Sequence, residues 1–173
     1  AHLQRAARGR LARRRAAEVR DVRQIDIFEQ ARADNAAMVE LLISGEFGDD
    51  YRVTDRDARG RTALMVAAEH GALATVRKCL ATSPRWDANA GLPGAQGWTA
   101  AHLAARRGKG AAAEYLAQRG GLDLRRHGAS LALCAARWGQ EGLLKVMVAL
   151  LGPDACLALR TAGAPPAAAA ATA

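Results

Sequence analysis

The side chains that could do chemistry in this chain are its histidines, cysteines and paired carboxylates, and their spacing argues against a catalytic or metal centre. No histidine has a cysteine or a second histidine at the spacing of a zinc site. Asp49 and Asp50 are adjacent beside Gly48, where a solvated loop is expected. The chain has no glycine-rich phosphate loop. The sequence therefore predicts no enzyme, no cofactor and no bound metal. The four histidines are His2, His70, His102 and His127.

The three cysteines indicate a reducing compartment. Cys79, Cys134 and Cys156 are odd in number and widely separated, which disfavours a disulfide scaffold. Cys79 and Cys134 fall at apolar positions of expected helices, so we interpret them as small buried packing groups; for Cys156 the sequence does not decide. We therefore expect an intracellular, cytoplasmic protein. Because the chain begins with alanine, we also expect it to be a piece of a longer protein.

Positive charge is concentrated in the first 23 residues. The chain carries a formal net charge of +8, and residues 1–23 hold eight arginines against two acidic residues, so the rest of the chain carries only +2. Such a segment favours an acidic partner, which can be a protein, a nucleic acid or an anionic membrane surface. An Arg-rich terminus is also typical of mitochondrial presequences, but this one lacks serine. No apolar stretch approaches the roughly 20 residues of a membrane span.

A repeated pattern supplies the elements that would position these side chains. Segments 60–71, 97–108 and 128–139 share a first glycine, a hydroxyl residue, a pair of alanines and a closing glycine at constant offsets. Each predicts a turn, then a short helix that a hydroxyl caps and a glycine ends. A second apolar helix follows in each unit, and residues 31–42 form a weaker copy. The predicted turn residues, caps and helix ends are Gly60, Thr62 and Gly71; Gly97, Thr99 and Gly108; Gly128, Ser130 and Gly139.

The segment from Gly97 to Gly108 resembles the ankyrin repeat signature, with Ala100 where that family usually has proline. The resemblance covers about residues 25–152. It implies an all-α ankyrin-repeat solenoid of about four helix-turn-helix repeats, at about 24–57, 58–94, 95–125 and 126–152. A loop-forming insertion at 83–94 accounts for the longer spacing before the third repeat. In this family the histidine at the place of His102 ties the turn to the helix by hydrogen bonds. Residues 153–173 are expected to form a capping segment and a disordered Ala/Pro tail.

The N-terminal segment, residues 1–23, is similar to the IQ motif. Leu3 and Gln4 are followed at the motif's spacing by Arg8, Gly9 and Arg13. The resemblance implies a basic helix bound by calmodulin or a calmodulin-like light chain, with Leu3 in a hydrophobic pocket and the arginines against an acidic rim. Two alternatives stay open. One is a solvated basic helix that leads into the repeats; the other is an arm that binds nucleic acid or anionic membrane, with the repeats as a spacer. The segment has no aromatic residue for base stacking.

Ankyrin repeats commonly contact partners through the turn before the first helix of each repeat and through the end of that helix. In this chain those positions are rich in arginine and tryptophan, residue types that often dominate binding energy. The resemblance thus implies a surface for an acidic segment of a second protein, and a non-enzymatic adaptor similar to IQ-motif-and-ankyrin-repeat proteins. The alternative is an ordinary solvated face. The predicted partner-binding residues are Arg59, Arg61, Glu69, His70, Gln96, Trp98, Arg106, Arg107, Arg126, His127, Arg137 and Trp138.

Overall fold

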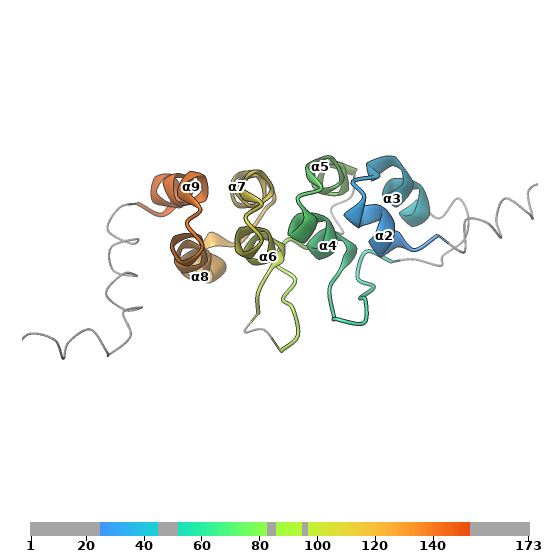
Figure 1. The fold of residues 1–173 in the computed structure, drawn as a ribbon, viewed down its shortest axis with the longest axis horizontal. Helices are drawn as coiled ribbons and strands as arrows, with labels where there is room; N and C mark the ends of the chain where they lie inside the picture. The colour runs from blue at the N-terminus through green and yellow to red at the C-terminus, as the bar shows by residue number, and fades with distance from the viewer. Residues whose placement is uncertain (1–24, 45–51, 83–85, 95–96, 153–173) are drawn as a thin grey trace, which may run out of the picture.

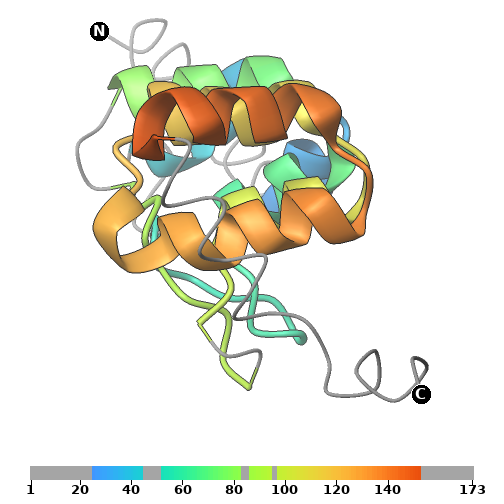
Figure 2. The ribbon, with the colours of Figure 1, turned by 90° about the vertical axis from the view of Figure 1, so that its left-hand side faces the viewer.

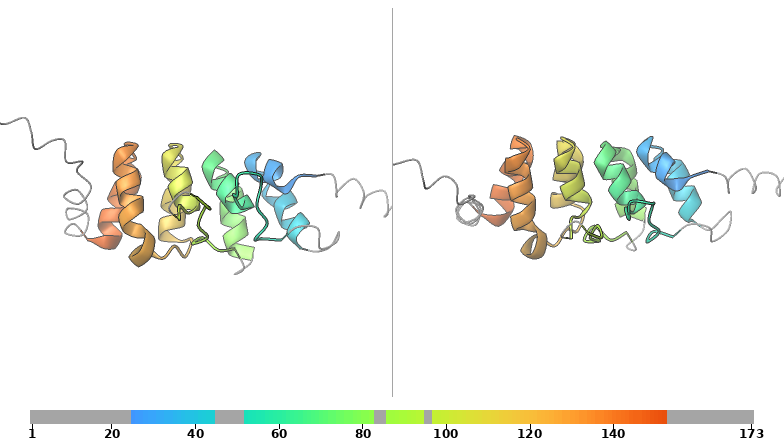
Figure 3. Two further views of the ribbon diagram at one scale, coloured as in Figure 1. Left: turned by 90° about the horizontal axis from the view of Figure 1, so that it is seen from below. Right: turned by 60° about the horizontal axis from the view of Figure 1, so that its bottom comes forward.

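The computed structural model describes residues 25–44, 52–82, 86–94 and 97–152 of the 173-residue chain. Within these ranges every regular element is an α-helix, and the helices form four helix–turn–helix pairs side by side (Figures 1 and 3). The all-helical ankyrin-type solenoid expected from the sequence is therefore confirmed. No described helix is long and apolar enough to cross a lipid bilayer. One row, the inner row, comprises α2 (Ile27–Arg32), α4 (Ala63–His70), α6 (Ala100–Arg106) and α8 (Leu124–Arg137), and the outer row comprises α3 (Ala36–Ile43), α5 (Leu73–Thr82), α7 (Gly110–Gln118) and α9 (Glu141–Leu151).

Hydroxyl caps and glycines set the ends of the first helix in the second and third units, as the repeated pattern predicts. The Oγ1 atom of Thr62 accepts a hydrogen bond of 3.3 Å from the backbone N–H of Met65 at the start of α4. Thr99 is the N-cap of α6. Gly71 ends α4 with φ 77°, a left-handed conformation that glycine adopts without the strain a Cβ would cause.

Buried alanines let neighbouring inner helices lie close together. Ala67, Ala104 and Ala135 come from α4, α6 and α8, and all three side chains are fully buried. These helices contact one another in chain order. Larger side chains such as Leu103 of α6 and Leu116 of α7 are also fully buried, and each fully buried leucine contributes about 1.5–3 kcal/mol. The core therefore runs along the stack, because no single helix pair encloses it.

The fourth unit departs from the predicted pattern. α8 begins at Leu124, because the carboxylate of Asp123 accepts hydrogen bonds from the backbone N–H groups of Arg125 (3.0 Å) and Arg126 (3.3 Å). The predictions that Ser130 caps the helix and that Gly128 marks a turn are therefore wrong: both residues lie inside α8. Gly128 packs tightly there, since a Cβ would lie 3.0 Å from a side-chain carbon of Leu151, which would have to shift.

The polypeptide before α4 and before α6 projects from the inner row as two loops on the same side (Figure 2). Arg56 Nη1 ties these loops together by donating to the carbonyls of Gly60 (2.6 Å) and Gly91 (3.2 Å). Trp86 anchors the insertion before α6, since its side chain is buried. The side of the inner row from which the loops project is called the inner face below.

The alanine contacts predict a position-specific cost of added volume in α8. Ala135→Leu places three extra carbons in a fully buried site and should lower the free energy of unfolding by about 1–3 kcal/mol. Ala136→Leu is the matched control, because Ala136 is the next residue of the same helix and is exposed. It should change stability by less than about 0.5 kcal/mol. Urea unfolding followed by circular dichroism measures both, and equal effects would contradict the close packing of the inner helices.

Candidate interaction surface

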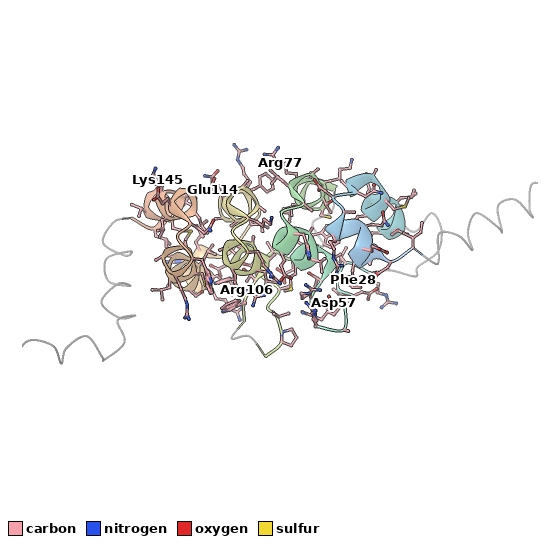
Figure 4. All side chains as sticks on the ribbon, viewed as in Figure 1. Phe28, Asp57, Arg77, Arg106, Glu114 and Lys145 are labelled. Atoms are coloured by element: carbon pink, nitrogen blue, oxygen red, sulfur yellow. The ribbon has the colours of Figure 1, made fainter. Side chains whose placement is uncertain are left out.

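Two tryptophans and two arginines form a continuous row on the inner face. The guanidinium carbon of Arg106 lies 5.5 Å from the ring centroid of Trp98, and that of Arg137 lies 5.5 Å from the ring centroid of Trp138. The two indoles meet edge to face, with centroids 5.8 Å apart. We call these four residues the Arg–Trp row. It joins the third and fourth units, and Figure 4 shows its Arg106 on the inner face, opposite Lys145 on the outer row.

Buried hydrogen bonds position Trp98. Its indole stacks on the ring of His102 at 6.2 Å and 18°. His102 Nδ1 accepts from the backbone N–H of Thr99 at 3.2 Å and lies 2.9 Å from the hydroxyl of the same residue. This confirms the tie between turn and helix implied by the resemblance. His102 is 1% exposed. Its burial and these hydrogen bonds fix the ring on which the indole of Trp98 stacks.

The same hydrogen bonds determine where the proton of His102 lies. Because Nδ1 accepts from a backbone N–H, the proton of the neutral ring is on Nε2. Nε2 lies 2.8 Å from the hydroxyl oxygen of Ser130, and that hydroxyl donates to the carbonyl of His127 at 2.9 Å. The hydrogen bonds therefore run in one direction from Thr99 to His127, across the α6–α8 contact.

The contact between His102 and Ser130 has the distance of a catalytic serine–histidine pair, but its polarity is opposite. A general base must accept the serine proton, whereas Nε2 of His102 donates to Ser130 and the serine proton goes to a carbonyl. Burial, with a smaller effect of the neighbouring His127, lowers the pKa of His102 to about 4. The pair is therefore a structural bridge between repeats.

A buried ion network lies beside the Arg–Trp row. The guanidinium of Arg61 donates to Asp57 from Nε (2.8 Å) and Nη2 (2.6 Å), and from Nη1 to Glu69. The other carboxylate oxygen of Glu69 accepts from Nε of Arg107 at 2.9 Å and contacts Nη2 of Arg106 at 3.4 Å. Burial alone would raise the pKa of Glu69, but the hydrogen bonds from Arg107 and Arg61 outweigh it and lower that pKa.

The ion network leaves positive charge on the inner face. Its three arginines face only two carboxylates, so one unit of positive charge is not neutralised within it. The Arg61 side chain is 7% exposed and enclosed, whereas those of Arg106 and Arg107 are 40% and 54% exposed. The excess charge is therefore presented to solvent by the two arginines at the end of α6.

The predicted partner-binding residues divide into three groups by exposure. Trp98 and Trp138 are half-buried, and Gln96 lies outside the described residues. Arg61, Glu69 and His127 are buried, so their expected place on an exposed surface needs correction: the first two neutralise each other, and His127 packs in α8 at 6.2 Å from His102. The exposed residues are Arg59, His70, Arg106, Arg107, Arg126 and Arg137.

The sequence analysis missed Asp57, the residue that allows Arg61 to be buried. A signal was present, because Asp57 precedes Arg61 by four residues across Gly60, a spacing that a tight turn closes. The predicted calmodulin-binding residues Leu3, Gln4, Arg8, Gly9 and Arg13 lie outside the described residues, so the IQ motif stays a prediction.

The two described cysteines match their predicted role as packing groups. Cys79 and Cys134 are both buried. Burial raises the pKa of the Cys79 thiol to about 12 and also raises that of Cys134, so both stay protonated and unreactive at neutral pH. Cys156 lies outside the described residues. Among the described residues no three histidine, cysteine or acidic side chains are close enough together to hold a metal ion.

The buried imidazole predicts a fall in stability with acid. The pKa of folded His102, about 4, is below its ordinary value of 6.5, so the unfolded chain binds more protons between these values. Stability should therefore decrease as the pH drops from 6.5 to 4, by on the order of 3 kcal/mol. Urea titrations at several pH values measure this.

His102→Gln should flatten most of that decrease, whereas the matched variant His70→Gln, which alters an exposed ring, should keep it. The remaining slope in His102→Gln reflects His127, whose pKa burial also lowers, and, at the acid end, Glu69 and Asp57, whose pKa values the arginines lower. An unchanged slope in His102→Gln would show that the ring is not the group that titrates.

Comparison with known proteins supports the architecture. Residues 64–117 match the family model described as ankyrin repeats (many copies). This range contains all of α5 and α6 and all but one residue each of α4 and α7, the two units with the best-formed caps and glycines. No curated protein matches the chain. Residues 64–117 thus resemble ankyrin repeats, and the all-helical fold of the described residues is that of an ankyrin-repeat solenoid.

Proposed function

We propose that this chain is a non-enzymatic adaptor that binds an acidic segment of a second protein on its inner face. Ankyrin repeats indicate a protein–protein interaction domain. The observation that carries the finer proposal is the set of exposed guanidiniums on Arg106, Arg107 and Arg137: the first two share the single carboxylate of Glu69, and among the described residues Arg137 has no ion pair. Arginine is well suited to this role, because its planar fork binds a carboxylate through two parallel hydrogen bonds.

The tryptophans of the Arg–Trp row add apolar area to this charged surface. Both indoles are half-buried, and their contacts with Arg106, Arg137 and each other restrict their rotamers before any partner binds. A preorganised aromatic and guanidinium surface loses little side-chain entropy on binding. Tryptophan and arginine are also the residue types that most often carry binding energy at interfaces.

Nucleic acid or an anionic membrane is the alternative partner class. Both would satisfy the arginines, and both would bind through phosphate charges with a steep dependence on salt. The basic N-terminal segment of residues 1–23 supports this alternative more than the repeats do, because most of the net charge lies there. The repeats would then act as a spacer.

For the N-terminal segment we propose recruitment of calmodulin or a calmodulin-like light chain. The support is the sequence alone: Leu3 and Gln4, followed at IQ spacing by Arg8, Gly9 and Arg13. A basic helix with a narrow apolar stripe suits an acidic protein with a hydrophobic pocket. The chain would then join two partners, one at each part.

Charge reversal on the inner face tests the main proposal. Arg107→Glu should weaken binding of a fluorescent oligo-glutamate peptide at least fivefold, a change of about 1 kcal/mol or more in the binding free energy. Lys145→Glu is the matched control, because Lys145 is exposed on the outer row (Figure 4). Fluorescence anisotropy measures both, and circular dichroism checks that both variants are folded at the assay temperature, since Arg107→Glu also removes a partner of the buried Glu69. Equal losses in the two variants, or tighter binding of a single-stranded oligonucleotide that neither variant affects, would contradict an acidic-peptide site on the inner face.

A calmodulin pull-down tests the second part of the proposal. The chain should be retained on immobilised calmodulin, in the presence or absence of calcium, because Leu3 and Gln4 would contact the partner directly. The double variant Leu3→Ala/Gln4→Ala should lose retention, whereas Arg107→Glu should keep it, since Arg107 is not part of the IQ-like segment. Retention of the double variant at the level of the original chain would refute the IQ interpretation.

A further inference from the structure

The Arg–Trp row has a length and an order of groups that specify more about its ligand than charge alone. Its groups follow one another as guanidinium, indole, indole, guanidinium, with contacts of 5.5, 5.8 and 5.5 Å. Positive charge therefore lies at both ends, and apolar ring surface lies between them. A ligand that matches this order needs two anionic groups with an apolar group between them.

The guanidinium at each end of the row has N–H groups that can still donate to a ligand. Arg106 uses only Nη2, in a contact of 3.4 Å, to reach Glu69. Among the described residues Arg137 has no ion pair, and its guanidinium lies over the ring of Trp138. A guanidinium carries five N–H donors. Most donors at both ends of the row are therefore available to carboxylate oxygens.

The span of the row limits the spacing of the two anionic groups. Added end to end, the three contacts allow at most about 17 Å between the guanidinium carbons of Arg106 and Arg137. These arginines come from adjacent inner helices, whose axes are expected to lie about 8–10 Å apart. An extended peptide advances about 3.3 Å per residue, so it covers this range in three to five residues.

We propose that the Arg–Trp row binds an extended peptide with two acidic residues three to five positions apart and an apolar residue between them. This inference rests on the proposed function and specifies its ligand. The carboxylates bind at Arg106 and Arg137, and the apolar side chain lies against Trp98 and Trp138. Glu69 acts as a positioning residue: its buried carboxylate holds Arg106 and Arg107 at the end of α6.

The ring contacts favour a peptide over a single-stranded nucleic acid. Proteins that bind single strands without sequence preference stack bases on exposed aromatic faces. Here the ring of Trp98 is contacted by Arg106 and by the stacked ring of His102, and the ring of Trp138 is contacted by Arg137. These contacts occupy ring surface that a base would need, while an aliphatic side chain can still pack against the ring edges.

Two isomeric peptides test the spacing. Both contain two glutamates and one leucine in a glycine–serine background and carry a fluorescein label. In the spaced peptide the glutamates are four positions apart with leucine midway; in the clustered peptide they are adjacent, with leucine at the end. Fluorescence anisotropy with the original chain should show the spaced peptide binding about fivefold more tightly, since one exposed ion pair contributes up to about 1 kcal/mol.

Arg137→Gln should remove this preference, so that both peptides bind with similar affinity, while the matched control Lys145→Gln should keep it. Equal binding of the two peptides to the original chain would overturn the spacing inference and leave the acidic-segment proposal standing. Failure of both peptides and of oligo-glutamate to bind would overturn both. A preference that persists in Arg137→Gln would place the second carboxylate elsewhere and contradict the assignment to the row.

Discussion

The close approach of the inner helices is the constraint on which the rest of this structure depends. Ala67, Ala104 and Ala135 are fully buried in consecutive inner helices that contact one another, and small side chains there permit adjacent repeats to meet. The hydrogen bond from His102 to Ser130 and the edge-to-face contact of Trp98 with Trp138 both cross from the third unit to the fourth. Without that spacing neither contact would form, and the Arg–Trp row would be four unrelated side chains.

The arginines of the ion network differ in exposure because they differ in their carboxylate partners. Arg61 is enclosed because Asp57 and Glu69 neutralise it, and the depressed pKa values of both carboxylates express the same pairing. Removing one member of such a pair is costly, because the other charge stays buried. Arg106 and Arg107 both contact the other carboxylate oxygen of Glu69, and their side chains stay exposed. The surface for recognition is thus supported by a charged network that is itself part of the core.

Local patterns in the sequence predict the helices well, and contacts between repeats explain the errors. Thr62 caps the helix that follows it through an atom three residues away, so its role is readable from spacing. Ser130 has the same spacing, but Asp123 starts α8 earlier, and Asp123 is held by a hydrogen bond of 2.6 Å from its N–H to Asn89 in the preceding repeat. Likewise Glu69 pairs with residues 37 and 38 positions later. The residues of the Arg–Trp row were predicted as surface positions. Their order in space was not, because it depends on how the repeats stack.

Amide hydrogen exchange of Thr99 tests the central claim most directly. A residue at a helix N-cap ordinarily has no intrahelical partner for its N–H group, but here that group donates to the buried Nδ1 of His102. The account predicts that the Thr99 amide exchanges as slowly as that of Leu103 in the middle of α6, because both require the stack to open. Exchange of Thr99 as fast as that of the exposed Gly97 would contradict the rigid contact between turn and helix that holds His102 against Ser130 of the next repeat.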